Sequence, residues 1–286
     1  MRYVNQLAAV SVLTLCVVSP VLAQGDIAFD FRTIDTTTTQ GNTTHGETTG
    51  HGVMSRGRVR FEMTGSSRMG KIPGFSPGGT MTMILADTGR TFILLDNEKK
   101  QYVQVDPAAV MEQLQKMVES MGQTMAIDIT GDDPKVENLG AGPDVMGHHT
   151  QHWRITNNTK VKIGVMGQTQ ITEASTVSDE YIATDVTNLF DPFRGLQSNP
   201  MASMFGAAAK AYADKMIAAR KKLPNGAPLR VDSHVKTNAN GREADVASSM
   251  EVTKIQNITA TPDMFAVPAD YKQVMLPNMP PRGTAP

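Results

Sequence analysis

The sequence has little cysteine, few aromatic side chains and almost no net charge. Cys16 is the one cysteine among 286 residues, so no disulfide can form within the chain. Aromatic residues make up 5% of the chain and the formal net charge is −1, which leaves no aromatic-interleaved basic patch of the kind that binds nucleic acid. Stability must therefore come from the packing of apolar side chains, and we expect no nucleic-acid partner.

A long hydrophobic run is also missing. The apolar stretch Leu7–Val18 is too short to span a bilayer. It follows the positive charge of Arg2 and precedes a small-residue cleavage site at residues 21–23. This pattern predicts a cleavable signal peptide over residues 1–23. We therefore expect a periplasmic or secreted protein with no stable transmembrane anchor.

Methionine is the residue type that is unusually abundant, with 19 copies. Its flexible thioether fills irregular gaps in a core, and it also lines adaptable surfaces that bind apolar ligands. The composition alone leaves both interpretations open.

Residues 80–122 hold the clearest secondary-structure pattern. Alternating apolar side chains with intervening turns predict three antiparallel strands between Thr80 and Val105. Asp106 and Pro107 suit the first positions of a helix, and Gly122 suits its end. This helix has an apolar stripe that an apolar sheet face would bury.

Sheet and helix together predict an apolar cavity, although a two-residue period does not say which strand face turns inward. The candidate lining residues are Met81, Met83, Phe92, Leu94, Met111, Leu114, Met117 and Val118.

The rest of the chain is expected to form one β-rich domain over residues 24–275. Further strands are predicted at 27–34, 56–63, 125–130, 135–139, 148–156, 161–166, 169–183, 229–236 and 244–258. A turn is expected at Asn157-Asn158, and a second helix is expected to end at residues 220–222. The Thr/Gly-rich residues 36–51 predict a mobile connection, with β extension as the alternative, and residues 276–286 predict a disordered Pro-rich tail.

A row of charges marks the strand at 56–63. Arg56, Arg58, Arg60 and Glu62 alternate with apolar or small residues, so all four side chains share one face. A solvated outer face is the simpler interpretation, and a row that binds anions or a partner protein is the sharper one.

Fragments of catalytic motifs fail on mechanism. Residues 74–78 have the spacing of a serine nucleophile elbow, but Pro77 has no N–H to donate to an oxyanion. Residues 65–71 approximate a phosphate-binding loop, but Ile72 replaces the metal-binding hydroxyl. We expect no catalytic residues.

The histidines do not have metal-ligand spacing. His148 and His149 would point to opposite faces of a strand, and His148 and His152 would lie roughly 13 Å apart. One ion cannot bridge that distance, so we expect neither a metal site nor a cofactor.

Four segments carry a resemblance to a known family: Gly57–Gly65, Met81–Val105, Val145–Trp153 and Met264–Lys272, the last with a telling Phe-x-Val-Pro-x-x-Tyr pattern. They resemble the bacterial exported family known as domain of unknown function 4412. That family is similar at fold level to the LolA-like periplasmic lipoprotein carriers, in which helices cover a curved antiparallel half-barrel around an apolar cavity. The resemblance implies no established activity, catalytic residue or cofactor.

We therefore expect an α+β fold, mainly antiparallel β, in which one or two helices cover a curved sheet or incomplete β-barrel of LolA-like type. The expected function is non-catalytic binding of an apolar ligand between sheet and helices, with a lipid, an acyl chain or a lipidated protein as the partner. The alternative is an envelope protein-protein interaction or sensing module with a filled core and no ligand. Under either hypothesis, we expect that the protein is not an enzyme.

Overall fold

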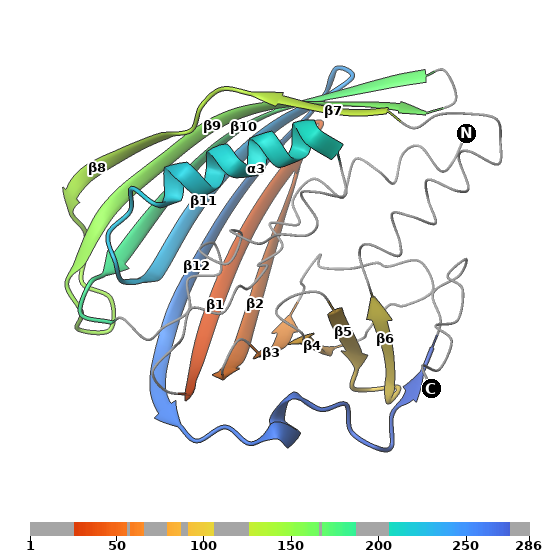
Figure 1. The fold of residues 1–286 in the computed structure, drawn as a ribbon, viewed down its shortest axis with the longest axis vertical. Helices are drawn as coiled ribbons and strands as arrows, with labels where there is room; N and C mark the ends of the chain where they lie inside the picture. Colours follow the sequence, from red (N-terminus) through yellow and green to blue (C-terminus); the bar gives the residue numbers. More distant parts are fainter. Residues whose placement is uncertain are drawn as a thin grey trace.

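One large sheet makes up most of the protein. The computed structural model describes residues 26–55, 58–65, 79–86, 91–105, 126–165, 168–186 and 206–274, and thirteen of its strands join a single sheet (Figure 1). The strands are β1 (Asp26–Thr39), β2 (Asn42–Ser55), β3 (Arg58–Gly65), β4 (Thr80–Ala86), β5 (Thr91–Asp96), β6 (Gln101–Val105), β7 (Ala126–Gly131), β8 (Lys135–Ala141), β9 (Thr150–Val165), β10 (Gln168–Ala183), β11 (Ala227–Ala239), β12 (Arg242–Ile258) and β13 (Lys272–Gln273). The pair β13–β6 is parallel, and the other pairs are antiparallel.

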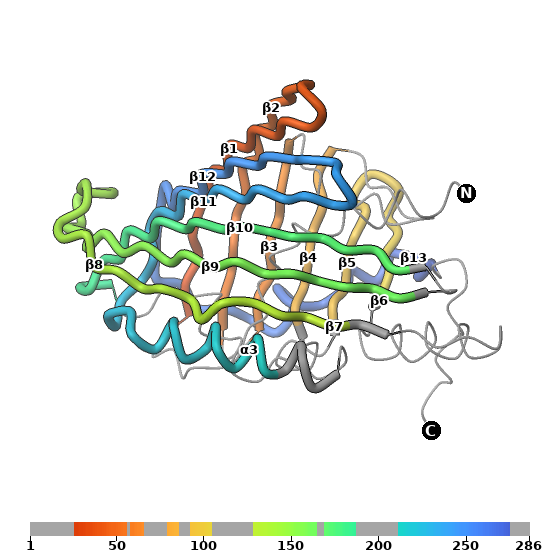
Figure 2. The backbone as a smooth tube through the Cα atoms, turned by 90° about the horizontal axis from the view of Figure 1, so that it is seen from above, coloured from red at the N-terminus to blue at the C-terminus, as the bar shows by residue number. Residues whose placement is uncertain are grey.

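The sheet turns through a large angle between its two halves. Its order is β13-β6-β5-β4-β3-β2-β1-β12-β11-β10-β9-β7, and β8 pairs with β9 beside β7. Figure 2 shows β9 to β12 crossing in front of β3 to β5, whose strands run in a nearly perpendicular direction. One face of each half therefore looks toward the other half. We call this the inner face and the opposite one the outer face.

The main core lies on the inner face. Its buried members are Ile27, Phe29, Phe31, Met54, Val59, Phe61, Met63, Met81, Met83, Leu85, Phe92, Val145, Ala183, Ala227, Leu229 and Val252. Phe61 meets the rings of Phe29 and Phe31 edge-on, at centroid distances of 5.9 and 6.1 Å, an arrangement that aromatic pairs favour. Strands from both halves contribute to this cluster, which therefore runs along the inner face across the bend of the sheet.

This architecture corrects the expected fold class. An α+β fold with one or two helices covering the sheet is wrong: the described residues are nearly all antiparallel strand, in a large open sheet. Their one α-helix, α3 (Gly206–Arg220), contacts β7 and β8 at one end of the sheet. The buried cluster runs across hydrogen-bonded strands of both halves, so the described architecture is set by the sheet, and α3 lies beside only one end of it. The helix predicted over residues 106–122 lies outside the described residues, whereas α3 corresponds to the second predicted helix.

Residues 36–51 belong to a long hairpin, not to a mobile connection. They lie in β1 and β2, which pair in register from Ile27 opposite Met54 to Thr39 opposite Asn42. Threonine is well suited to a pleated strand because of its branched Cβ. The hydroxyl groups of Thr38 and Thr43 lie 2.9 Å apart across the hairpin and form a hydrogen bond. The turn at Gln40 and Gly41 adopts positive φ values of 51° and 81°.

The turn predicted at Asn157-Asn158 is also absent, because β9 continues through it. The amide of Asn157 donates to the Tyr212 hydroxyl on α3 at 2.7 Å, and the amide of Asn158 donates to Asp132 at 3.1 Å. Both side chains thus have partners across neighbouring elements, which favours an extended backbone over a local turn.

A C-terminal strap, residues 259–274, crosses the outer face of β1 to β5. It contains the short helix η4 (Pro262–Phe265) and ends in β13, which pairs with β6. Phe265 joins a second buried cluster with Ala28, Val53, Ile84 and Leu95. The strap therefore covers part of the outer face of one sheet half and packs against its apolar side chains.

The arginine row contacts this strap. The Arg58 guanidinium lies 4.6 Å from the centroid of the Phe265 ring, a cation–π geometry. Arg60 donates to Glu62 at 2.6 Å and to the Met264 carbonyl at 3.2 Å. Arg58 and Arg60, which were predicted to face solvent or a binding partner, therefore make contacts within the chain. Arg56 lies outside the described residues.

The predicted signal peptide, residues 1–23, and the predicted tail, residues 276–286, also lie outside the described residues. Within the described part of the chain, no helix is long and apolar enough to cross a membrane.

Candidate functional site

The structure describes four of the eight residues that were predicted to line an apolar cavity. Met81 and Met83 on β4 and Phe92 on β5 lie on the inner face, where 8%, 7% and 5% of their surfaces are exposed. Leu94 is partly buried and packs against the same cluster. The four strand residues therefore do share one face. The predicted helix residues Met111, Leu114, Met117 and Val118 lie outside the described residues.

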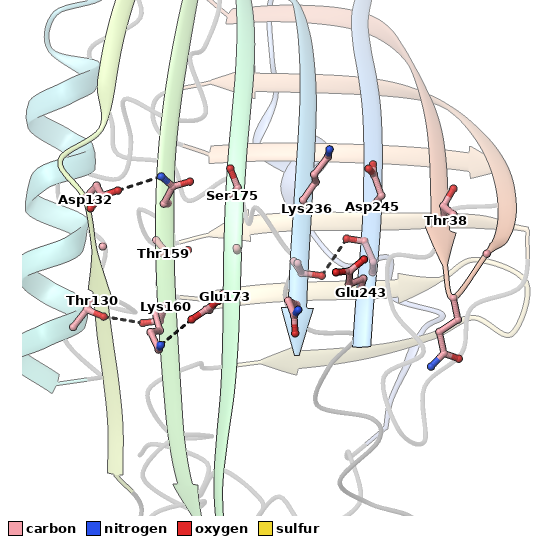
Figure 3. A pocket seen from close by; sticks show the side chains of 18 residues that line it. Thr38, Thr130, Asp132, Thr159, Lys160, Glu173, Ser175, Lys236, Glu243 and Asp245 are labelled. Atoms are coloured by element: carbon pink, nitrogen blue, oxygen red, sulfur yellow. Dashed lines mark hydrogen bonds and ion pairs between the residues drawn. The ribbon is translucent and has the colours of Figure 1, made fainter. Parts of the chain in front are cut away.

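A large hollow on the described surface is polar. It is a shallow trough of about 1020 Å³ that crosses β7, β9, β10, β11, β12 and the β1–β2 turn (Figure 3). The lining residues are Thr38, Gln40, Gly41, Thr130, Gly131, Asp132, Asn158, Thr159, Lys160, Glu173, Ala174, Ser175, Lys236, Thr237, Asn238, Glu243, Ala244 and Asp245. Hydroxyl, amide, ammonium and carboxylate groups dominate this lining, so the trough suits a polar ligand and not an acyl chain.

The charged side chains of the trough lie on the outer face. On β12, Met250 packs against the inner core, and Asp245 lies five residues away along an unbroken pairing with β11. Successive side chains in a strand alternate between faces, so Asp245 points outward. Lys236 on β11 pairs directly with Asp245 and shares its face.

The sheet register arranges these outward side chains in two rows that run across the strands. The first row is Asn158, Ser175, Lys236, Asp245 and Thr38, and the second row is Thr130, Lys160, Glu173, Asn238 and Glu243. Neighbouring strands lie about 4.8 Å apart, so each row spans about 19 Å. The trough is therefore an elongated surface with a polar group at every strand.

Contacts within the trough hold several of these groups in place. Lys160 donates to Glu173 at 2.7 Å, and this hydrogen bond lowers the pKa of the Glu173 carboxyl. The Thr130 hydroxyl donates to the Lys160 carbonyl at 3.4 Å, and Asp245 accepts from His234 at 2.5 Å. The trough thus combines oriented side chains with the rigid backbone of a paired sheet.

An ion-pair network lies beside the trough on the same face. Asp179 accepts from Arg154 and from His152, both at 2.8 Å. Burial raises the pKa of Asp179, but the hydrogen bonds from these two side chains outweigh burial and hold the pKa below its ordinary value. His152 also stacks on Tyr181 at a centroid distance of 4.6 Å. The network stabilises the outer surface of β9 and β10.

His148 and His149, which are adjacent in the sequence, each pair with a different carboxylate. His148 contacts Asp185 at 2.8 Å, and His149 contacts Asp144 at 2.7 Å, which raises the pKa of His149. Within the described ranges, no group of three or more metal-ligating side chains has the geometry to hold an ion.

Sequence reasoning did not find the trough. Its residues come from strands far apart in the chain, and each strand contributes at most three of them. Period-two alternation identifies which residues share a face of one strand, but only the register of β9 to β12 and β1 brings those faces together.

Comparisons with solved structures give only distant similarities. The chain has 9% identity to PNGF-II at a TM-score of 0.28, with 86% of this chain and 31% of PNGF-II covered, so it spans about a third of that protein. It has 8% identity to the ywiB protein from Bacillus subtilis at a TM-score of 0.22, with 80% and 94% covered. It has 7% identity to Ail, the attachment invasion locus protein of Yersinia pestis, at a TM-score of 0.15, with 80% of this chain and 97% of Ail covered. These likenesses carry no argument about fold or function, and they do not establish the expected similarity to LolA-like carriers.

Sequence comparison is more informative at the family level. No curated protein matches the chain. A family model described as domain of unknown function (DUF4412) matches residues 33–271, which include most of the inner core, the trough and most of the C-terminal strap. The chain belongs to this family of domains of unknown function, DUF4412.

Proposed function

We propose that the protein is a non-catalytic binding module that recognises a polar partner through the trough on its outer face. The observation that carries this proposal is the trough itself, in which five adjacent strands each add polar side chains to a common surface. Binding sites combine concavity with a few well-placed polar groups, and groups on paired strands are held more rigidly than groups on loops.

The inner core supports the same proposal. Phe29, Phe31, Phe61 and Met83 have 9% or less of their surface exposed, so this cluster behaves as a filled core. That matches the hypothesis of a module with a filled core. The contact surface differs from the arginine row first considered, and it includes Thr38 and Gln40 from the Thr/Gly-rich segment.

Blocking the trough tests this function. Ser175 is exposed in the first row, between Asn158 and Lys236, and Ser175→Arg places a large cation there. We expect immobilised wild-type protein to retain a component of a cell-envelope extract, and the Ser175→Arg variant to lose it. Gln256→Arg, an exposed site on β12 outside the trough, is the matched control and retains binding. Equal retention by all three proteins contradicts the proposal.

A second candidate function is storage or transport of an apolar ligand, for which the methionines of the inner face are the specific support. Met54, Met63, Met81 and Met83 lie in one cluster, and flexible thioethers repack around apolar guests more readily than branched side chains. Native mass spectrometry after gentle purification tests it. Co-purified lipid, or uptake of a fluorescent fatty acid, supports this candidate, and the absence of both opposes it.

Both candidates include export, as the predicted signal peptide implies. Fractionation of cells that express the full chain tests this part of the proposal. We expect a processed protein that lacks residues 1–23 in the periplasm or the medium, and an unprocessed protein in the cytoplasm contradicts it.

A further inference from the structure

We infer that the ligand of the trough is a neutral, hydroxyl-rich oligosaccharide chain that lies across the strands. This inference rests on the proposed binding function and names the chemical class of the partner. It follows from the spacing, the charge balance and the shape of the trough.

The spacing of polar groups fits a linear polymer with a short repeat. The first row presents an amide, a hydroxyl, an ammonium, a carboxylate and a second hydroxyl on consecutive strands, at intervals of about 4.8 Å. This interval is close to the length of one sugar residue in an extended chain. The second row lies two residues away along each strand, roughly 7 Å, so the two rows can contact both edges of one chain of sugar rings.

The donors and acceptors also fit hydroxyl groups. A sugar hydroxyl both donates and accepts, so it bonds equally to carboxylate, amide, hydroxyl and ammonium groups. The trough holds Lys160 and Lys236 together with Asp132, Glu173, Glu243 and Asp245. The four anions outnumber the two cations, so a polyanion such as nucleic acid or an acidic polysaccharide is disfavoured by like-charge repulsion.

A peptide fits the trough less well. The strands β9 to β12 and β1 each have a paired neighbour on both sides, so their backbones cannot accept an added strand. Ala174 and Ala244 lie between the two rows, so by strand alternation their methyl groups point to the inner face. The lining therefore has no apolar pocket for the aromatic or aliphatic anchors that peptides and proteins bury. A glycan needs neither feature.

A glycan array of neutral linear oligosaccharides of increasing length tests the inference on the whole protein. We expect affinity for one linkage type to rise with chain length and to level off once the chain spans the rows. Ser175→Arg should weaken that binding about tenfold or more, and Lys236→Met, which keeps the apolar stem and removes the ammonium donors, should weaken it by a smaller factor. Gln256→Arg should bind as the wild type does, and thermal unfolding of each variant checks that its fold is intact.

Treatment of the envelope extract separates failure of this inference from failure of the proposed function. Periodate cleaves the vicinal diols of sugars, and protease removes polypeptide. Retention that depends on Ser175, is lost after periodate and survives protease supports an oligosaccharide. If retention depends on Ser175 but is lost after protease and survives periodate, the partner is a protein, and the inference fails while the binding function stands. If no component depends on Ser175 and no array member binds, both are overturned.

Discussion

The ring of Phe31 on β1 lies directly over Gly50 on β2. A Cβ atom built at Gly50 would lie 2.3 Å from Cζ of Phe31 and 2.9 Å from the Glu62 carbonyl oxygen. Gly52 has the same relationship to Phe29, at 2.3 Å. The two phenyl rings of the inner core thus occupy the space that side chains on β2 would fill, which is why a segment rich in glycine packs as a strand in the centre of the sheet.

Gly50→Ala should destabilise the protein for this reason. The added methyl group must displace the Phe31 ring from a packed core, and overpacking of that kind costs roughly 1–3 kcal/mol. Urea unfolding of the wild type and the variant measures the change. Thr49→Ala, at an exposed position on the same strand, should change stability by less than about 0.5 kcal/mol. If both variants are equally stable, the ring is not held against Gly50.

Comparison of β4 with the β1–β2 hairpin shows what the sequence could and could not predict. The alternation of Met81 and Met83 identified strands and their common face, because period two is a local property of one strand. The strand structure of residues 36–51 was not predictable in this way, since Gly50 is favourable only opposite Phe31. That pairing is set by register.

The trough could be predicted from the sequence only in part, for the same reason. Lys160 and Glu173 are close in sequence, and their pairing follows from the β9–β10 hairpin. Lys236 and Thr38 reach the same surface only because β12 lies between β11 and β1, a long-range arrangement that no local pattern contains.

Phe265 should anchor the C-terminal strap. Its side chain is 8% exposed and lies under the Arg58 guanidinium, and loss of a buried phenylalanine typically costs about 3–5 kcal/mol. Phe265→Ala should therefore lower the melting temperature clearly and make the C-terminal residues accessible to protease. Met264→Ala, next to it and 38% exposed, is the control and should leave both properties unchanged. Protease resistance in Phe265→Ala would show that the strap is held by its backbone contacts to β6 instead.

Tyr212 on α3 should ionise late. Burial raises its pKa to about 12, because the tyrosinate anion is poorly solvated there. A raised pKa means that the stability contributed by the neutral phenol is fully present below the ordinary pKa of about 10 and is lost as the pH rises toward 12. The tyrosinate absorbance of the folded protein should show a late component that Tyr212→Phe removes. If Tyr212→Phe instead reduces the absorbance change at the ordinary tyrosine pKa and leaves the high-pH part of the curve unaltered, Tyr212 is not buried in this way.

Arg220 and Glu180 form an ion pair that fixes the end of α3 against β10. The Nη2 atom of Arg220 lies 2.7 Å from Oε1 of Glu180, and the two side chains are 7% and 0% exposed. Removal of one partner from a buried pair leaves a charge in a poorly solvated site, which typically costs about 3–5 kcal/mol. Glu180→Leu and Arg220→Met should each destabilise the protein by an amount of this order, measured by urea unfolding.

The double variant Glu180→Leu/Arg220→Met discriminates between two roles of this pair. If the pair is a net source of stability, the double variant should remain clearly less stable than the wild type. We expect the opposite, recovery to near wild-type stability, because two apolar side chains of similar volume avoid the desolvation cost of two charges and can pack against the neighbouring cluster of Ile155, Ile182 and Leu223. Glu173→Ala, which removes the exposed Lys160–Glu173 pair on the same strand, should leave stability nearly unchanged, since exposed ion pairs contribute little. A double variant that stays as unstable as the single ones would show that the charges themselves hold α3 on the sheet.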